Sequence, residues 1–291
     1  GEADGFTVGT VDSIIGITTA TTTASGTESG DITLSVAAGS ITLTQNLTTG
    51  TSTVADAGGV TTAKSGDISV TSVTGITGAG RAITGNATVD ATTAGAGDVD
   101  TATSGNITLN VTGSGDVGLS GSNALTIGSA TVTNNTANDT ATTGNIVVTS
   151  ADRINNGISP NALDVSFGSA SGGQTNTAGT LAATTDGGAG AAGEIQVTSA
   201  EALNIAALST AGGTGQTVSI STTVGAALTI TNASESLSGD TITLSAGAGT
   251  LTIADTSFTS GNGNLTLIGD EVSLTGGADS RVRPQPFGKG V

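Results

Sequence analysis

One short motif recurs along this chain: a glycine, a small polar residue, and then alternating apolar and polar residues. In the first copy Ile32, Leu34 and Val36 alternate with Thr33 and Ser35, which is the period of a half-buried β-strand. Each copy therefore predicts a corner followed by a core strand. The copies lie at Gly30–Val36, Gly66–Val70, Gly105–Leu109, Gly144–Val148, Gly193–Val197 and Gly263–Leu267, with a shifted copy at Gly239–Leu244.

The spacing of the motif indicates a repeat architecture. The first four motif glycines occupy positions 30, 66, 105 and 144, at nearly even intervals, and the next follows after a longer interval at position 193. Such self-similarity is typical of a solenoid, a propeller or an array. A propeller needs tight antiparallel hairpins, but only Asn156-Gly157 and Asn262-Gly263 offer Asn-Gly turns, and neither joins two alternating runs. A parallel β-helix fits better.

The sequence is compatible with two lengths for one coil. Further apolar points at Ile41/Leu43 and Leu47 suggest a coil of roughly 20–24 residues, about 12–14 coils in all and on the order of 60 Å of rod. A coil of about 39 residues would halve that length and carry large side excursions, such as 51–65. The shorter coil is the favoured expectation, and 168–192 is then a long insertion.

Composition favours an ordered all-β chain over a disordered one. The 291 residues include 47 Gly and only four Phe, with no Cys, Met, Trp, Tyr or His. However, charged residues make up only 10% and the mean hydropathy is +0.19, whereas disordered chains combine low hydropathy with high charge. No stretch has a helical period with caps, so essentially no helix is expected. With so few aromatic residues, the core must be narrow and elongated.

The charge of the chain excludes several partners. The net charge is −17 with only six Lys and Arg, which argues against nucleic acid and anionic membrane surfaces. No apolar run is long enough for membrane insertion. The absence of Cys excludes a disulfide scaffold and a thiolate metal site. Because the chain begins at Gly1 without a leader pattern, we expect a processed product or a fragment.

The residue pattern of several segments resembles the repeat region of filamentous-haemagglutinin-like bacterial exoproteins. These segments are Gly30–Leu34, Gly39–Leu43, Asn46–Gly50 and Gly263–Gly277. The resemblance covers about 30–277 and rests on degenerate motifs. It implies a right-handed parallel β-helix in an extracellular cell-surface adhesin, often secreted by a two-partner system. The Asn-Pro signatures of that family's secretion domain do not occur, so the resemblance implies a piece of the repeat shaft.

Candidate chemistry is sparse. Acid–base catalysis needs converging carboxylates, and the nearest groupings are Asp98/Asp100 and Asp270/Glu271, which lack His, Tyr and most basic partners. We interpret them as turn carboxylates. Asp and Asn in glycine-rich corners resemble calcium ligands, but no calcium-binding repeat or loop occurs, so diffuse cation binding is the expectation. No catalytic, cofactor or metal residue is assigned, and the chain is not expected to be an enzyme.

Two further features concern the surface. The residue after the motif glycine is Asp31, Asn106, Asn145 or Glu194, so we expect a ladder of side-chain acceptors at a corner rather than a catalytic acid. Threonine-rich runs such as 18–27 could carry sugars, making a glycoprotein. Asn-x-Ser/Thr sequons, which matter only in glycosylating hosts, lie at Asn46, Asn86, Asn106, Asn110, Asn134, Asn138, Asn232 and Asn264.

The chain divides into an N-terminal strand or cap region at 1–29, solenoid repeats at 30–280 and a basic, proline-containing tail at 281–291. The tail is either a cap or linker, or a docking segment for the acidic end of the next subunit. The functional expectation is a structural or adhesive protein that self-associates head to tail into filaments or contacts surface glycans or host ligands. The alternative is a carbohydrate-binding or polysaccharide-degrading β-helix.

Overall fold

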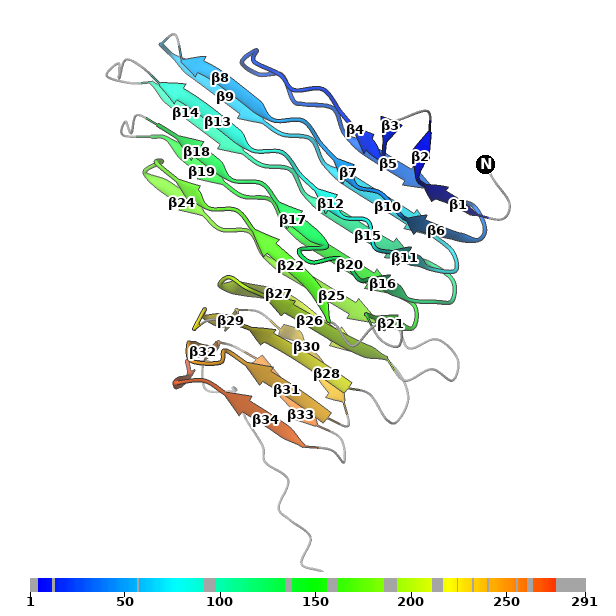
Figure 1. Cartoon of the computed structure of the whole chain (residues 1–291). Helices are drawn as coiled ribbons and strands as arrows, with labels where there is room; N and C mark the ends of the chain where they lie inside the picture. Colours follow the sequence, from blue (N-terminus) through cyan, green and yellow to red (C-terminus); the bar gives the residue numbers. More distant parts are fainter. Residues whose placement is uncertain are drawn as a thin grey trace, which may run out of the picture.

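The computed structural model is an all-β solenoid in which the chain winds into stacked coils (Figure 1). It describes residues 5–11, 14–56, 58–91, 98–133, 138–155, 162–185, 193–210, 217–223, 225–231, 233–239, 241–254, 256–260 and 264–275. No helix occurs in these ranges. The described strand pairs are parallel, apart from the hairpin of β2 (Thr10–Val11) and β3 (Ile14–Ile15). The predicted all-β parallel solenoid is therefore confirmed.

Sheet I runs along the whole described solenoid and has nine described strands, one from each coil. Its inward-facing residues stack in register, and one column begins at Ile32 and ends at Leu274. Eight steps of about 4.8 Å make a rod of roughly 38 Å. The strands are β5 (Ile32–Ser35), β10 (Ile68–Ser72), β15 (Ile107–Val111), β20 (Ile146–Ser150), β25 (Leu181–Thr185), β27 (Leu203–Thr210), β29 (Leu228–Ile230), β32 (Thr250–Ile253) and β35 (Glu271–Leu274).

Sheet II faces sheet I across the core and has fourteen strands. In the first coils it consists of two strands separated by a corner, and these merge at β26, where Ile195 pairs with Ile154 and Val197 pairs with Leu163. The strands are β1 (Gly5–Val8), β4 (Ile17–Thr18), β6 (Ser40–Leu43), β7 (Leu47–Thr48), β11 (Ile76–Gly78), β12 (Ala82–Ile83), β16 (Val117–Leu119), β17 (Leu125–Ile127), β21 (Arg153–Ile154), β22 (Leu163–Phe167), β26 (Glu194–Ser199), β28 (Thr217–Thr222), β31 (Thr241–Ser245) and β34 (Leu265–Ile268).

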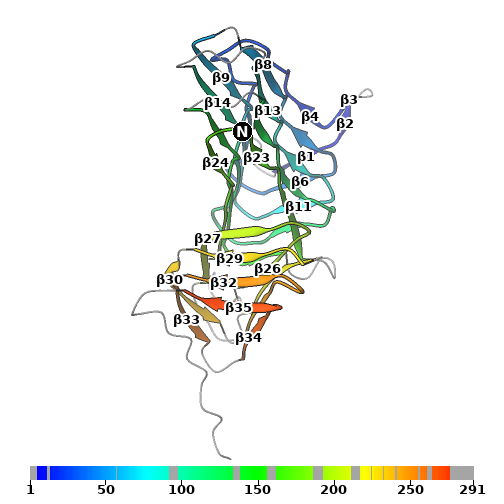
Figure 2. The ribbon, with the colours of Figure 1, turned by 90° about the vertical axis from the view of Figure 1, so that its left-hand side faces the viewer.

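Two small sheets form an arm on the first coils (Figure 2). Sheet III consists of β8 (Ser52–Asp56), β13 (Ala87–Ala91), β18 (Ala130–Val132) and β23 (Ala170–Ser171). Sheet IV consists of β9 (Val60–Lys64), β14 (Val99–Thr103), β19 (Thr140–Thr142) and β24 (Thr175–Thr177). Among the described residues neither sheet continues into the C-terminal coils, where β30 (Ala233–Gly239) and β33 (Thr256–Ser260) pair instead.

Coil length changes along the molecule because the arm ends. Ile32, Ile68 and Ile107 are stacked neighbours, so each of the first coils spans the long interval from one of these positions to the next. Leu228, Leu251 and Val272 are also stacked neighbours, and the intervals between them are much shorter. The expected short coil is therefore right only for the C-terminal part. The expected 12–14 coils are too many, and 51–65 is a side excursion of its coil.

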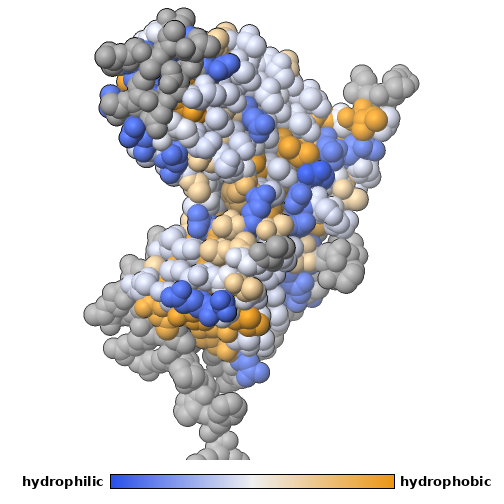
Figure 3. Space-filling view, turned by 60° about the vertical axis from the view of Figure 1, so that its left-hand side comes forward, coloured by the Kyte–Doolittle hydropathy of each residue, from blue (hydrophilic) through white to orange (hydrophobic). Residues whose placement is uncertain are grey.

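Figure 3 shows a hollow in the surface between the wide first coils, which carry the arm, and the narrow C-terminal coils.

The main solenoid, formed by sheets I and II, and the arm, formed by sheets III and IV, each have their own core. The main core is built from buried Ile, Leu and Val of sheets I and II, and Phe6 packs half-buried against it. The core of the arm is small and consists of valine and alanine: Val54, Ala63, Ala87, Val89, Ala102, Ala130, Val132 and Ala141. Small side chains let the two arm sheets lie close together. This explains why Thr/Ala-rich segments with few large apolar residues still form regular strands.

A line of hydroxyl groups separates the two cores. Ser65 donates across the coil to the carbonyl of Gly85 at 2.7 Å and accepts the N–H of Gly105 from the next coil at 2.8 Å. Ser29 and Thr49 bond in the same way. A side chain on Gly105 would overlap the carbonyl oxygen of Gly66, so this motif glycine serves close stacking of the coils. We call this line the waist.

The predicted acceptor ladder exists at the corner before sheet I. Oδ1 of Asp31 accepts the N–H of Asp67 at 2.8 Å, and Oδ1 of Asn106 accepts the N–H of Asn145 at 2.8 Å. Glu194 does not belong to this ladder. It lies on β26 of sheet II, opposite Arg153. The later motif copies start strands of sheet II, because the arm no longer separates one copy from the next.

The segments outside the main repeats are placed as follows. Part of the predicted N-terminal region, 1–29, enters the first coil, since β1 pairs with β6 and β4 pairs with β7. The predicted insertion at 168–192 contains three strands: β23, β24 and β25. The basic tail at 281–291 lies outside the described residues.

Candidate functional site

The predicted pair Asp98/Asp100 lies at the outer end of the arm, next to Asp56 and Asp139. All four carboxylates are buried: Asp139 is 0% exposed, Asp100 1%, Asp56 6% and Asp98 9%. Asp56 ends β8, whereas Asp100 and Asp139 lie in neighbouring rungs at the start of sheet IV. The fold therefore brings together acidic residues that are far apart in the chain, from position 56 to position 139. We call this group the arm-tip cluster.

The arm-tip carboxylates bind main-chain donors. Oδ1 of Asp56 accepts the N–H of Gly58 at 2.7 Å and the hydroxyl of Thr61 at 2.8 Å. Asp98 accepts the N–H of Gly59 at 2.8 Å. Asp139 accepts the N–H of Asp100 at 2.9 Å. Two buried oxygens, Oδ2 of Asp56 and Oδ1 of Asp100, have no hydrogen-bond partner.

Burial and the negative charge of neighbouring carboxylates together set the electrostatics of the arm tip. Burial, followed by the charges of Asp56, Asp139 and Asp98, raises the pKa of Asp100 to about 6. A hydrogen bond from Thr61 opposes the shift. A buried carboxylate is costly unless a positive charge or hydrogen bonds compensate it.

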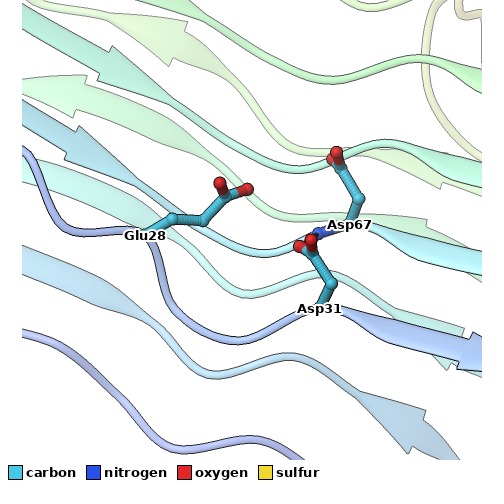
Figure 4. A group of neighbouring side chains, drawn as sticks. All are labelled: Glu28, Asp31 and Asp67. Carbon is cyan, nitrogen blue, oxygen red and sulfur yellow. Dashed lines mark hydrogen bonds between the residues drawn. The ribbon is translucent and has the colours of Figure 1, made fainter.

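A second acidic group lies at the waist, where Glu28, Asp31 and Asp67 converge (Figure 4). Their ligand oxygens lie within 4.8 Å of one another, and no other group of three or more acidic residues in the described part is as close. However, Nζ of Lys64 lies 2.6 Å from Oε1 of Glu28. That hydrogen bond raises the pKa of Lys64 against partial desolvation, and the charges of Asp67, Glu28 and Asp31 add to it. The positive charge of Lys64 therefore compensates the negative charge of these three carboxylates, and the four residues form an ion-pair network.

The second predicted pair, Asp270/Glu271, lies where β35 begins, with Glu271 as the first residue of the strand, and both residues are exposed. Among the described residues no basic side chain is placed to assist either acidic pair. Arg81 donates to the carbonyl of Asn123 at 3.0 Å. The positive charge of Arg153 favours the ionised carboxyl group of Asp116, which directly precedes β16 of sheet II. The two acidic pairs thus lie on different parts of the molecule.

The C-terminal end of the rod exposes core positions. Val272 and Leu274 of β35 stack on Leu251 and Ile253, which are buried. They are nevertheless 42% and 53% exposed. β35 and β34 each pair with one strand only, as β5 and β1 do at the other end. Sheets I and II therefore have unpaired edges at both ends of the described part, and unpaired edges are templates for further strands.

The outer face of sheet IV carries threonine in two columns. Thr62, Thr101, Thr140 and Thr175 occupy one column, and Thr103, Thr142 and Thr177 occupy the next, in line with Lys64. Hydroxyls therefore repeat about every 4.8 Å across the strands and roughly every 6.7 Å along them. This is a regular hydrogen-bonding surface.

The remaining surface features are less organised. Asn46, Asn86, Asn138 and Asn264 of the sequons are exposed, Asn106 and Asn110 are half-buried, and Asn134 and Asn232 lie outside the described residues. A polar pocket of about 290 Å³ lies beside Asp164 and Thr198, where the two halves of sheet II merge. Asp164 accepts the N–H of Asn123 at 2.8 Å there.

Sequence reasoning found Asp98 and Asp100 but missed Asp56 and Asp139 as their neighbours. The signal that would have found them is the strand register of the arm. In three successive coils an aspartate lies at the outer end of a Val/Ala strand, and the register brings these ends together. It also missed the Ser/Thr–Gly dipeptides of the waist. These recur at nearly regular intervals, with their hydroxyl residues at Ser29, Thr49, Ser65, Thr84 and Ser104.

Comparison with known proteins adds no identity. No family model matches the chain, and no similar curated protein or solved structure was found. In the described part, no helix has the length and apolar character needed to cross a membrane.

Proposed function

We propose that this chain is a structural and adhesive β-solenoid of an extracellular cell-surface filament, of the filamentous-haemagglutinin-like kind. The observation that carries the proposal lies at the C-terminal end of the described coils, where the core-column residues Val272 and Leu274 are exposed. A core column that ends exposed is completed when another coil is stacked on it.

A second copy of the chain supplies matching edges. Sheet I begins at β5 with Ile32 and ends at β35 with Leu274 in the same column. Sheet II begins with Phe6 and ends with Leu265 in another single column. Head-to-tail stacking therefore places Leu274 on Ile32 and Leu265 on Phe6, and continues both sheets. Such a heterologous contact does not close, so it makes a filament.

Filament formation is tested by negative-stain electron microscopy and light scattering over a range of protein concentrations. We expect filaments whose length grows with concentration. The double substitution Val272→Asp and Leu274→Asp places charge in the contact and abolishes them. The matched control is Val147→Asp, since Val147 is 38% exposed on the flank of sheet I and not at an end. Monodisperse rods at every concentration, or equal assembly of the end variant, contradict the proposal.

The threonine columns of sheet IV favour a second candidate function, carbohydrate binding. A flat array of hydroxyls with a constant repeat suits a polymer whose hydroxyls also repeat. Thr101→Glu and Thr142→Glu on sheet IV then weaken binding to surface polysaccharides, whereas Ala55→Glu on the exposed face of sheet III does not. Release of reducing ends from such polysaccharides, retained by the filament-contact variant, would make a degrading enzyme the better description.

A further inference from the structure

The arm-tip cluster poses a problem of charge that the fold alone leaves open. Asp56, Asp98, Asp100 and Asp139 are all at least nine-tenths buried. The basic side chains of the described part act elsewhere: Lys64 at the waist, Arg81 at a corner of sheet II and Arg153 beside Asp116. Several buried carboxylates in one place are costly, and a bound cation is one way to offset that cost besides hydrogen bonds and protonation.

Among the described residues, two buried carboxylate oxygens of the cluster have neither a positive charge beside them nor a hydrogen-bond donor. Oδ2 of Asp56 and Oδ1 of Asp100 are buried without a hydrogen-bond partner, and their residues are only 6% and 1% exposed. Asp56 is the strongest charged neighbour of Asp100, and the hydroxyl of Thr61 contacts both carboxyl groups. The two carboxyl groups that carry an unpartnered oxygen therefore lie beside the same hydroxyl group, that of Thr61.

We propose that the arm tip binds one calcium ion, with Asp56 and Asp100 as direct ligands and Asp98 and Asp139 as supporting charge. All the donors are oxygen, which suits a hard cation. Calcium accepts irregular geometry and fills its remaining positions with water and carbonyl oxygens, whereas magnesium demands a regular octahedron. Asp56 and Asp100 can therefore act as two of the ligands without forming a closed cage.

Two acidic groups compete as cation sites, and charge compensation separates them. Glu28, Asp31 and Asp67 lie closer together, but Lys64 already compensates them. The arm tip has a looser arrangement and no lysine or arginine among its described neighbours. Compensation decides the case, because a cation at the waist must displace the lysine, whereas a cation at the arm tip neutralises the buried charge of Asp56 and Asp100.

The ion also serves the fold. Asp56 comes from sheet III and Asp100 from sheet IV, so a bound ion ties the two sheets of the arm together at their outer ends. The small Val/Ala core holds the same sheets together farther in. Calcium binding therefore stabilises the arm in particular, because a ligand that binds only the folded state raises stability by mass action.

The test is calorimetric titration of chelator-stripped protein with calcium chloride in a buffer of physiological salt, followed by thermal melts monitored by circular dichroism. We expect one saturable site and a melting temperature that rises with calcium concentration. Salt at this level screens diffuse binding to surface carboxylates. Magnesium at the same concentration gives a smaller rise.

Two variants at the site and one control make the result specific. Asp100→Asn and Asp56→Asn each remove one charged ligand and keep the side-chain shape, so each weakens calcium binding at least about tenfold. Asp31→Asn at the waist leaves calcium binding unchanged. Circular dichroism of each variant at low temperature confirms that it is folded. Absence of saturable binding in the wild-type chain overturns the proposal, as does unchanged binding in Asp100→Asn. Loss of binding in Asp31→Asn assigns the ion to the waist and equally overturns it.

Discussion

Oδ1 of Asp67 accepts the backbone N–H of Asn106 at 2.6 Å, so a side chain of one coil binds the main chain of the next. Asn106 in turn donates from Nδ2 to the same oxygen at 3.1 Å and accepts from Asn145 above it. The corner is thus held by side chains at a point where the sheet ladder is interrupted. Any residue with a short side chain and an acceptor oxygen can take this place, which explains the mixture of Asp and Asn.

The ladder predicts a difference between two substitutions of Asp67. Asp67→Ala removes the acceptor and leaves the N–H of Asn106 without it, which lowers the free energy of unfolding by about 1 kcal/mol. Asp67→Asn keeps an acceptor oxygen in place, so its stability stays closer to that of the wild-type chain. Urea denaturation followed by circular dichroism measures both. Equal stability of the two variants would show that the acceptor contributes nothing.

Close stacking at the waist predicts a strong effect at Gly105. In Gly105→Ala the added methyl group overlaps the carbonyl of Gly66, and the adjoining bond from Gly105 N–H to Ser65 must lengthen. We expect a loss of stability of the order seen for overpacked cores, about 1–3 kcal/mol or more. Gly9→Ala is the control, because its nearest neighbour is the hydroxyl of Thr44 at 3.6 Å. The thermal midpoints of the two variants should differ clearly, and similar midpoints contradict the role of the glycine.

The unequal cores predict unequal local stability. The apolar core of the arm consists of valine and alanine, whereas the core between sheets I and II contains many isoleucine and leucine side chains. Segments with little buried apolar area open at low free energy, so their amides exchange quickly. Hydrogen-exchange mass spectrometry should therefore find faster exchange in β14 and β19 than in β15 and β20 of the same coils. Slower exchange in the arm would mean that the waist bonds, rather than the core, set its stability.

The strands themselves could be predicted from the sequence because their alternation is local. Ile107, Leu109 and Val111 lie on one face at every second position, and all three are buried as that period requires. The acceptor role of Asp31 followed from a similar local comparison of motif copies. In both cases the residues that decide the structure are adjacent in the chain.

The winding of the coils could not be predicted in the same way, because it depends on distant partners. The copies at Gly144 and Gly193 look alike, but Ile146 belongs to sheet I and Ile195 to sheet II. What separates them is whether the segment before each copy can form an arm, and that depends on hydrogen bonds between distant positions, such as the one from Ser65 to Gly85. The arm-tip cluster was hidden for the same reason, since Asp56 and Asp100 meet only after two sheets have formed.

The arm-tip cluster finally predicts how stability depends on pH. Burial and the neighbouring aspartates raise the pKa of Asp100 to about 6 in the folded chain, above the value of about 3.9 expected for an unfolded aspartate. Between these two values the folded state binds more protons than the unfolded state, so the contribution of Asp100 is fully present below about pH 4 and is lost as the pH rises through about 6. Asp100→Asn removes this contribution and should flatten the decline of stability between pH 4 and 7 when chelator is present. Urea midpoints at each pH, with Asp90→Asn on the exposed face of sheet III as the control, measure the difference. A steeper decline in Asp100→Asn than in the wild-type chain would reverse the sign and contradict the assignment of a buried carboxylate held among like charges.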